Sequence, residues 1–404
     1  MRSRAGLIGL LGVLCCLGPL SVDAYLPAFP AIAAEFGAGE SEVQLSLTTF
    51  IVGMAVGQLV VGPLSDSWGR RKPLLIGIAG YVVVSLVCAF APSVLALSGL
   101  RLAQGLGVAS GFVIAMAVAR DLFSGLAMAR FMSLLMLVNG MGPIVAPVLG
   151  GQVLRFASWR GTFVVLAVFG VLLLVALAAW LPETLPAERR RPANVPGTLR
   201  VFRGLLADRV FLGYALASAF ALGSLFGYVA GASFVLQGVF GLTPQQFSLV
   251  FGANSAAIFL SGAVNTWLTG RIMPRGLLRI GLVAAVAGGL GLLAVGLAGG
   301  GLPYFLPPLF VVTASVGLLL PNAATLAMSR HPEAAGSASS VLGVTQFVTG
   351  GLLAPLVGAA GSASVLPMTA VMAAATAVAL LSFAVLTRGD AGITAHEPEE
   401  VPVP

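Results

Sequence analysis

The chain has 404 residues, of which 58% are hydrophobic and only 9% are charged. An ordinary soluble domain carries about 25% charged residues, so this composition excludes a soluble globular protein and indicates a chain that lies mostly within a lipid bilayer. The formal net charge is +7. It does not indicate a nucleic-acid partner, because the basic residues are spread over the ends of apolar segments instead of forming one patch.

Twelve stretches of mostly apolar residues are long enough to cross a bilayer as helices, which takes roughly 20 residues each. These stretches lack the period-two alternation of a transmembrane β-strand, which excludes a membrane β-barrel. The sequence therefore predicts an all-α membrane protein. In chain order the predicted transmembrane helices are 6–27, 43–64, 74–92, 94–118, 132–154, 160–181, 208–236, 245–270, 276–299, 302–328, 335–360 and 363–387.

The beginning of the chain has an alternative interpretation as a secretory signal, since Arg2 and Arg4 precede an apolar run that ends in small residues. We favour a first transmembrane helix, because the run is long enough to span and its removal would leave an odd number of helices. The cysteines, Cys15, Cys16 and Cys88, all fall inside predicted helices. They are interpreted as small hydrophobic residues and not as a disulfide framework.

The basic residues are distributed unequally between the two sides of the membrane. Of the 21 Lys and Arg residues, 18 lie at a terminus or in a loop that follows an even-numbered helix. Arg155 and Arg160 lie on the other side, and Arg101 lies within a helix. Because cytoplasmic loops of membrane proteins carry an excess of Lys and Arg, we expect both termini to be cytoplasmic.

A polar segment at 181–209, rich in arginine and interrupted by prolines, separates six predicted helices from six. Two similar sequences, "GRRKPLLIG" (69–77) and "MPRGLLRIG" (273–281), each join the second and third helices of a half. This internal echo favours two six-helix bundles related by pseudo-two-fold symmetry. The predicted units are an N-terminal bundle (1–181), a solvated cytoplasmic linker (182–207), a C-terminal bundle (208–388) and a disordered cytoplasmic tail (389–404).

The first predicted helix carries one acid, Asp23, in "PLSVDAYLP". An ionised side chain inside hydrocarbon costs about 2.5–3.5 kcal/mol even on the lenient scale, so it usually faces a partner or a water-filled path. Arg101 is the one basic residue well inside a predicted helix, and the helical rise places it at a depth similar to that of Asp23. We expect an ion pair that breaks when Asp23 takes up a proton, since arginine effectively stays charged. The alternatives are a purely structural pair, or an aspartate that caps the helix near the headgroups.

A second group of charges lies at the predicted cytoplasmic side. The segment "GPLSDSWGRRKPLL" between the second and third helices contains Asp66 and Arg70, and "VARDLF" at the end of the fourth helix contains Asp121. These three side chains are expected to form a cluster that holds the cytoplasmic ends together in one conformation. The alternative is a solvated anchor, because exposed ion pairs contribute only about 0–1 kcal/mol.

The fifth helix concentrates small residues and prolines in "NGMGPIVAPVLGG" (139–151), which predicts a closely packed, bent helix. Polar side chains in the other helices are candidates for a substrate cavity, although each is equally suited to bridge two helices. These candidates are Tyr25, Gln58, Gln104, Asn139, Tyr228, Asn254, Asn265, Asn322 and Gln346.

Several of these segments resemble known signatures. "GPLSDSWGRRK" resembles the loop 2–3 signature of the major facilitator superfamily, and "RLAQGLG" (101–107) resembles its helix 4 motif. "APVLGG" (146–151) resembles the helix 5 signature associated with antiporters, with Ala146 where glycine is usual. Together with "PLSVDAYLPAFP", "SWRGTF", "LPETLP" and "LPNAATLAM", they are similar to the Bcr/CflA drug-resistance transporters.

The resemblance implies a proton-coupled exporter of antibiotics and other small amphipathic compounds in the bacterial inner membrane. It implies no cofactor and no metal, with the proton gradient as the energy source, and we expect a monomer. The implied roles are proton coupling for Asp23 and Arg101, a cytoplasmic gate for Asp66, Arg70 and Asp121, and an antiporter motif at Gly142, Pro143, Pro147, Gly150 and Gly151. Some related exporters have a second acid deeper in helix 1; here that region contains Cys15, which puts a two-acid scheme for cationic drugs in doubt.

Other functions remain as alternatives. A metabolite or sugar carrier, working as a symporter, would share the fold. A polytopic membrane enzyme is disfavoured, because His331 and His396 both fall outside the predicted helices and the sequence contains no HExxH or GxSxG motif. A receptor or scaffold is disfavoured because the sequence predicts no extramembrane domain.

Overall fold

The computed structural model describes residues 4–123, 125–190, 202–331, 334–359 and 364–390. Within these residues the chain is helical and no β-sheet forms. Eleven helical segments of the described chain are long and apolar enough to cross a membrane. A further helix of 32 residues, α7 (Gly125–Phe156), lies between the fourth and fifth of them in the chain. The predicted all-α membrane fold is confirmed.

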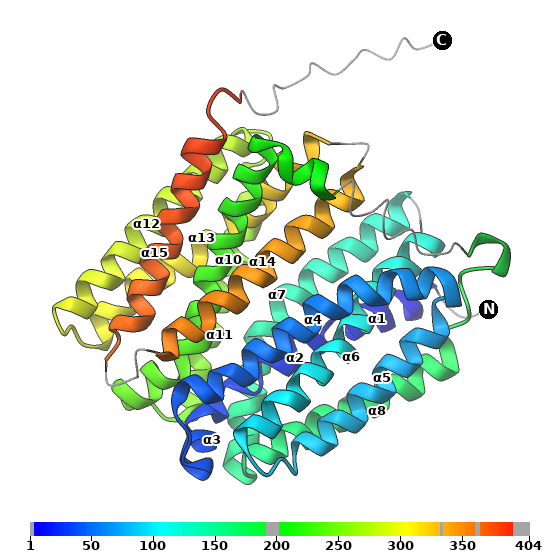
Figure 1. The fold of residues 1–404 in the computed structure, drawn as a ribbon, viewed down its shortest axis with the longest axis horizontal. Coiled ribbons are helices and arrows are strands. Elements are labelled where there is room, and N and C mark those ends of the chain that lie inside the picture. The colour runs from blue at the N-terminus through cyan, green and yellow to red at the C-terminus, as the bar shows by residue number, and fades with distance from the viewer. Residues whose placement is uncertain (1–3, 124, 191–201, 332–333, 360–363, 391–404) are drawn as a thin grey trace.

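The first half of the chain supplies one bundle, seen in blue to teal in Figure 1. Its elements are α1 (Arg4–Cys15), α2 (Leu17–Asp23), the 3-10 turn η1 (Leu26–Ala28), α3 (Phe29–Phe36), α4 (Glu40–Trp68), α5 (Arg71–Cys88), α6 (Val94–Leu122), α7 and α8 (Trp159–Trp180), followed by the 3-10 turn η2 (Ala187–Arg189).

The second half supplies the other bundle, seen in green to red. Its elements are α10 (Arg209–Ser233), the π-helical turn η3 (Phe234–Val239), α11 (Pro244–Leu268), α12 (Pro274–Leu297), α13 (Leu302–Ser329), α14 (Ala335–Ala359) and α15 (Leu366–Leu386). Of the predicted linker, residues 191–201 lie outside the described chain, as do residues 391–404 of the predicted tail.

The first transmembrane segment extends further than the sequence predicted. Instead of ending near Pro27, the helical chain continues through η1 and α3 to Phe36, where Gly37 takes a left-handed conformation (φ 58°) and ends it. Pro27 and Pro30 each lie in the first turn of a short helix, a position at which proline is compatible with helical backbone. These prolines therefore interrupt the helix without ending the segment. Asp23 lies inside it, and the interpretation of Asp23 as a helix cap near the headgroups is wrong.

The two halves repeat the same packing. In the first half α5 lies between α6 and α8, and in the second half α12 lies between α13 and α15. At matching positions, Arg71 Nη2 donates to Ala178 O at the end of α8 (2.6 Å), and Arg275 Nη2 donates to Thr387 O just after α15 (2.9 Å). The internal echo in the sequence thus corresponds to a repeated contact. The halves meet where α7 packs on α11 and α4 packs on α14.

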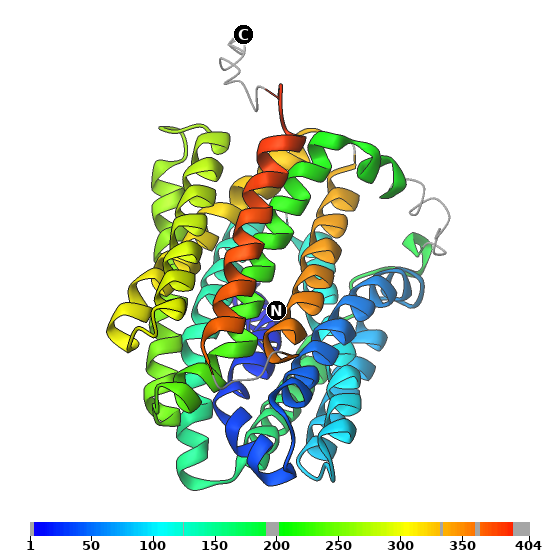
Figure 2. The same cartoon turned by 60° about the vertical axis from the view of Figure 1, so that its left-hand side comes forward.

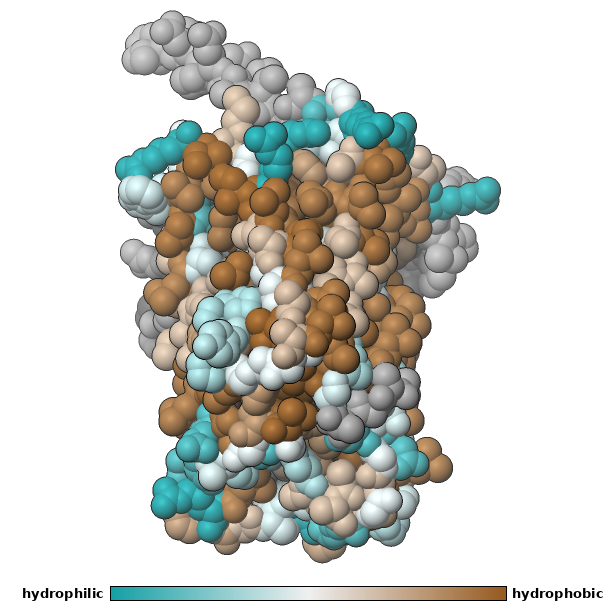
Figure 3. Space-filling model, turned by 90° about the vertical axis from the view of Figure 1, so that its left-hand side faces the viewer, coloured by the Kyte–Doolittle hydropathy of each residue, from teal (hydrophilic) through white to brown (hydrophobic). Residues whose placement is uncertain are grey.

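The molecule has two distinct ends. We call the end that carries the start of α1 and the end of α15 the terminal end, and the end that carries α3 the distal end. Figure 2 shows α3 at the bottom, opposite the end of α15. In the face shown in Figure 3, hydrophobic residues cover most of the middle and hydrophilic residues gather toward both ends. This distribution fits a molecule whose middle lies in hydrocarbon.

Candidate functional site

Asp23 is the last residue of α2 and is buried, with 6% of its surface exposed. Its carboxylate makes no hydrogen bond with any described residue. A buried carboxylate without a partner is costly when ionised. The free energy of this arrangement therefore depends strongly on whether Asp23 carries a proton.

Arg101 lies in the first half of α6 and is fully buried. Its guanidinium carbon lies 4.1 Å from the centre of the Phe50 ring and 4.7 Å from the centre of the Tyr25 ring, so two aromatic faces stabilise the charge. Nη1 donates a hydrogen bond to Gln104 Oε1 (2.5 Å). Nε and Nη2 have no hydrogen-bond partner among the described residues.

The expected ion pair between Asp23 and Arg101 does not form in this conformation. The backbone stays helical through Ala24 and Tyr25, so two residues along the chain correspond to about 200° around the axis. Tyr25 faces Arg101, and Asp23 consequently lies on the other side of the segment. Depth along the helix was a sound argument, but it carried no information about rotation.

A chain of hydrogen bonds connects Arg101 to the first transmembrane segment by another path. Gln104 Nε2 donates to Ser85 Oγ (2.7 Å), which donates to Tyr81 O (2.6 Å). The Tyr81 hydroxyl in turn bonds Ser21 Oγ on α2 (2.8 Å). This buried network ties α6, α5 and α2 together. Ser21, Tyr81 and Ser85 were not predicted, because a single hydroxyl in an apolar helix is not a distinctive signal.

The other candidate cavity residues fall into two groups. Tyr25, Gln104, Tyr228, Asn254 and Asn322 are buried, whereas Gln58 and Gln346 are partly exposed. The side chain of Asn139, on α7, lies outside the described part of the structure.

Three of the candidate asparagines take part in bonds that bridge helices within the second half. Thr313 Oγ1 donates to Asn254 Oδ1 (2.9 Å), and Asn322 Nδ2 donates to Asn265 Oδ1 (2.6 Å). Both bonds join α11 to α13, which fits the interpretation of these amides as bridges.

The glycines of α7 let neighbouring segments approach closely. A methyl group at Gly142 would lie 2.8 Å from Pro19 Cβ, and one at Gly150 would lie 2.0 Å from the carbonyl oxygen of Ala24. Gly151 faces α11, where a methyl group would lie 2.5 Å from Ser248 Oγ. Pro143 and Pro147 lie inside the same helix. The segment therefore packs on both halves of the molecule, and its small residues make that packing possible.

At the terminal end, the structure brings together the three predicted gate residues. Arg70 Nε donates to Asp121 Oδ2 (3.0 Å), and its Nη1 forms an ion pair with Asp66 and a hydrogen bond with Ser65 Oγ (2.8 Å). The arginine is 8% exposed, while the Asp66 side chain is about half exposed. The cluster is thus a network around a buried cation, which is a stronger arrangement than an isolated surface pair.

Glu183, within "LPETLP", is a member of this region that the sequence did not identify. Its carboxylate accepts hydrogen bonds from the backbone N–H of Arg70 (2.8 Å) and of Arg71 (3.2 Å), at the start of α5. Burial alone would raise the pKa of Glu183, but these bonds and those from the backbone N–H groups of Leu185 and Thr184 lower it below its ordinary value. A carboxylate at a helix N-terminus also meets the positive end of the helix dipole. Glu183 therefore ties the segment after α8 to α5.

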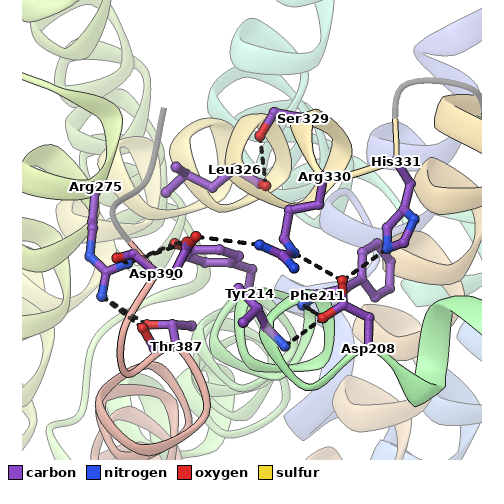
Figure 4. Close-up of polar contacts among 11 residues, drawn as sticks. Asp208, Phe211, Tyr214, Arg275, Leu326, Ser329, Arg330, His331, Thr387 and Asp390 are labelled. Atoms are coloured by element: carbon purple, nitrogen blue, oxygen red, sulfur yellow. Dashed lines mark hydrogen bonds and ion pairs between the residues drawn. The ribbon is translucent and has the colours of Figure 1, made fainter. Parts of the chain in front are cut away.

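The second half has its own charge cluster at the terminal end (Figure 4). Asp208 caps the N-terminus of α10. Its Oδ2 accepts a hydrogen bond from Arg330 Nε (2.9 Å) and lies 3.0 Å from His331 Nε2. Arg330 also pairs with Asp390, which pairs with Arg275 at the start of α12 (3.3 Å each). Burial alone would raise the pKa of Asp208, but the Arg330 hydrogen bond and the N-terminal N–H groups of α10 lower it to about 2. This cluster joins the ends of α10, α12, α13 and α15.

The hydrogen bonds that described residues make between the halves lie at the distal end. Ser233 Oγ donates to Leu26 O (2.7 Å), Gln237 Nε2 donates to Pro27 O (3.3 Å), and Gln245 Nε2 donates to Gly151 O (3.0 Å). The ion pairs that described residues form in each of the two charged clusters at the terminal end stay within one half. The halves are thus joined by polar contacts at the distal end.

The comparisons with known proteins agree with this architecture. Residues 11–355 match the model of the Major Facilitator Superfamily. The chain is 40% identical to the Bacillus subtilis protein YdgK, described as an uncharacterized MFS-type transporter, over 97% of this chain and 98% of that protein. It is 33% identical to the bicyclomycin resistance protein homolog of Haemophilus influenzae, over 93% and 95% of the two chains.

A solved structure shows the same fold. A bacterial homolog of the human lysosomal transporter Spinster, in an inward-facing and occupied conformation, aligns with a TM-score of 0.76 over 96% of both chains at 14% identity. With the helical repeat, the loop 2–3 cluster and these relatives, the chain belongs to the Major Facilitator Superfamily, among its Bcr/CflA-type drug transporters, and is a multi-pass membrane transporter, not an enzyme.

Proposed function

We propose that this protein exports small amphipathic compounds, antibiotics among them, across the bacterial inner membrane in exchange for protons. The observation that carries the proposal is the burial of Asp23 without an ion pair to a described residue, in a segment whose Leu26 carbonyl accepts a hydrogen bond from Ser233 of the other half. Loss or gain of one proton there changes the free energy of an arrangement that both halves share. A relative named for bicyclomycin resistance supports an antibiotic as substrate.

The terminal end is proposed to be cytoplasmic. Of the 21 Lys and Arg residues, 18 lie at that end by the sequence-based topology, as expected for cytoplasmic loops. On this orientation the polar contacts between the halves close the outer side. The structure then represents the conformation in which substrate enters from the cytoplasm.

The proposed cycle couples the proton to the movement of the halves. Asp23 loses its proton toward the cytoplasm, substrate binds, and the halves rearrange to open outward. Uptake of a proton from outside neutralises Asp23 and favours return. Each proton that moves inward supplies about 2.3 kcal/mol per 100 mV of membrane potential, and no cofactor is needed. Arg101, held by Gln104 and two aromatic rings, is proposed to keep the first segment oriented and not to pair with Asp23 in this conformation.

The substrates are proposed to be neutral or weakly charged. Among the described residues within the membrane-spanning helices, the candidate groups for the cavity are Asp23, amides and phenols, for example Gln58 and Tyr228, whereas Glu35 and Glu40 line pockets at the distal end. Such a surface offers hydrogen bonds and apolar contact, without the second carboxylate that a permanently charged dication would favour. The transporter is proposed to act as a monomer in the bilayer.

Replacement of Asp23 by asparagine tests the proposal. Asp23→Asn keeps the size of the side chain and cannot ionise, so proton-driven efflux per inserted molecule should fall to the background of vector-only cells. The measurement is efflux from a pump-deficient bacterial host, normalised to the amount of transporter in the membrane, together with drug-induced proton release. Wild-type efflux by Asp23→Asn would refute the proposed role.

The direction of transport separates export from the symport alternative. Everted vesicles with an inward-acid gradient should accumulate an exported compound, whereas a metabolite or sugar symporter would accumulate its substrate in right-side-out vesicles. Accumulation only in right-side-out vesicles would contradict export and leave the fold assignment untouched.

A further inference from the structure

The start of α4 packs against the second half of the molecule at the distal end. A methyl group at Gly358 of α14 would lie 2.7 Å from Ser41 Cα and 2.3 Å from Gln44 Oε1. The missing side chain of Gly358 therefore lets the two helices approach closely. Because this contact joins the two halves, it is lost when the distal end opens.

Glu40, the first residue of α4, lies at the same contact. It lines a small pocket together with Gln44 and with apolar side chains of the second half, among them Phe234, Val357 and Met368. The volume of this pocket is about 10 Å³, which is at the lower limit for a single water molecule. The side of Glu40 that faces the second half thus meets apolar surface and very little water.

The carboxylate of Glu40 has no counter-charge in the first half. Glu40 is partly buried and makes no ion pair or hydrogen bond with a described residue. The two neighbouring acids have partners of their own, since Glu42 accepts a hydrogen bond from the backbone N–H of Gly39 (2.8 Å) and Glu35 pairs with Arg160. Neither of them brings a free cation to Glu40.

The second half brings no charge to this pocket either. By sequence, η3, α14, α15 and the connection 360–365 contain no ionisable side chain. On α10, Arg209 and Tyr214 lie toward the terminal end, and Tyr228 stacks on Phe251. The other titratable groups on the elements packed around α4 bond elsewhere: Tyr25 to Ser46, Tyr81 to Ser21 and Arg101 to Gln104.

We propose that Glu40 is an outer proton-binding site that controls closure of the distal end. When the distal end is open, water hydrates the first turn of α4, and the positive end of the helix dipole favours a carboxylate there. Closure replaces part of that water by apolar side chains of the other half, which disfavours the charged form. The closed distal end therefore prefers Glu40 with its proton.

An unsatisfied amide in the same pocket supports this assignment. Gln44 Oε1 is buried and has no hydrogen-bond partner among the described residues. Glu40 and Gln44 are one helical turn apart and line one pocket, and side chains at this spacing are neighbours on a helix. A protonated carboxyl can donate to an amide oxygen, whereas a carboxylate can only accept. The neutral form of Glu40 is thus the form that suits its surroundings in the closed molecule.

The direction of this effect agrees with the proposed cycle, on which the inference rests for the identity of the outer side. Protons from outside neutralise Asp23 and Glu40 alike, and both events favour return to the conformation that is closed at the distal end. Because coupling between proton binding and conformation is reciprocal, an alkaline outer side slows closure. Glu40 binds and releases its proton on the same side, so it adds no net proton to the exchange.

Distances across the distal end, measured against pH, test the inference. Nitroxide labels at Phe90→Cys, after α5, and Tyr304→Cys, on α13, occupy exposed positions on opposite halves. The distances are measured by pulsed electron paramagnetic resonance on the purified full-length chain in lipid nanodiscs, from pH 5 to pH 9. The parent protein carries Asp23→Asn, which removes the titration of the proposed carrier. In this parent, alanine replaces the native cysteines Cys15, Cys16 and Cys88.

In this parent, the ratio of distal-closed to distal-open molecules should be at least about threefold higher at pH 5 than at pH 9. That ratio corresponds to a difference of about half a pH unit in the proton affinity of Glu40 between the two conformations. Glu40→Gln cannot ionise, so its ratio should stay at the low-pH value throughout. Glu42→Gln is the matched control, because it makes the same change at an exposed residue and keeps an acceptor for the Gly39 N–H. It should follow the parent.

The outcomes decide the role of Glu40 separately from that of Asp23. Retention of the parent's pH dependence by Glu40→Gln overturns the inference, and so does a parent whose distance distribution does not change with pH. Loss of the pH dependence in Glu42→Gln as well would assign the effect to the charge of the helix end and not to Glu40. Wild-type efflux by Asp23→Asn would refute the proposed carrier, and the closure measurement would still decide Glu40 by itself.

Discussion

At the scale of single residues, Gly150 sets how closely α7 approaches the first transmembrane segment. A methyl group there would lie 2.0 Å from the carbonyl oxygen of Ala24, a main-chain atom that cannot rotate away. Ala24 follows Asp23 directly in the chain. The absence of one methyl group on α7 therefore helps to position the proposed proton carrier.

Gly150→Ala should force α7 and the first segment apart. Overpacking of this kind costs about 1–3 kcal/mol, so the purified variant should unfold at a lower temperature and transport more slowly. Gly99→Ala on α6 is the matched control, since a methyl group there meets nothing within 4 Å. Thermal unfolding in detergent measures both variants. An unchanged unfolding temperature for Gly150→Ala would show that the helices adjust without loss.

At the scale of elements, the charged clusters connect the ends of helices within each half. Arg70 joins the loop after α4 to the end of α6, and Glu183 joins the segment after α8 to the start of α5. Asp208 and Asp390 do the same for the second half. The helices of each bundle are thereby connected at the terminal end. None of the ion pairs that the described residues form there joins one half to the other.

The Arg70 network should show energetic coupling. Arg70→Ala and Asp121→Ala remove the two partners of one bond of a buried cation, so their combined effect on transport rate should be smaller than the sum of the single effects by about 1 kcal/mol. Arg155→Ala with Asp121→Ala is the control pair, because these residues lie at opposite ends of the molecule. Additive effects for Arg70 and Asp121 would leave the cluster as a solvated anchor.

The Asp208 cluster should give the second half a dependence on acid. With a pKa of about 2 in the folded protein against an ordinary value of 3.8, the ionised form is stabilised by folding. That stability is present above about pH 4 and is lost as the pH falls through 2, with an upper limit of about 2 kcal/mol. Asp208→Asn keeps a good capping side chain and should unfold at a temperature that changes less between pH 5 and pH 2.5. Equal acid sensitivity of the two proteins would contradict the assignment.

At the scale of the whole molecule, the topology decides where substrate enters. Fusions of a fluorescent protein that matures only in the cytoplasm, and of alkaline phosphatase that is active only outside, should report both ends of the chain as cytoplasmic. The physical basis is the excess of basic residues on that side, 18 of 21. Phosphatase activity from either end would reverse the proposed orientation and turn the structure into an outward-open form.

The sequence by itself determined the membrane fold, the chain order of its helices and the family. Hydropathy over about 20 residues is a local property, and motifs such as "GPLSDSWGRRK" lie within single loops. The sequence also singled out Asp23 and Arg101, because a charge in an apolar helix is rare whatever surrounds it. It also placed the three gate residues at the same end of the molecule, because the number of preceding helices determines the side of the membrane on which a loop lies.

Only the tertiary structure decided which of these residues meet. Arg101 meets Tyr25 and Gln104, whereas Asp23 forms no ion pair with Arg101. These contacts depend on how each helix is rotated about its axis and on which helix lies beside it. Packing between segments far apart in the chain, such as Gly150 against Ala24, sets both the rotation of a helix and the identity of its neighbours. Because successive helical residues are rotated by about 100°, a shift of one residue is enough to point a side chain away from a contact. The depth of a residue along its helix can be counted from the sequence, but the direction in which its side chain points cannot.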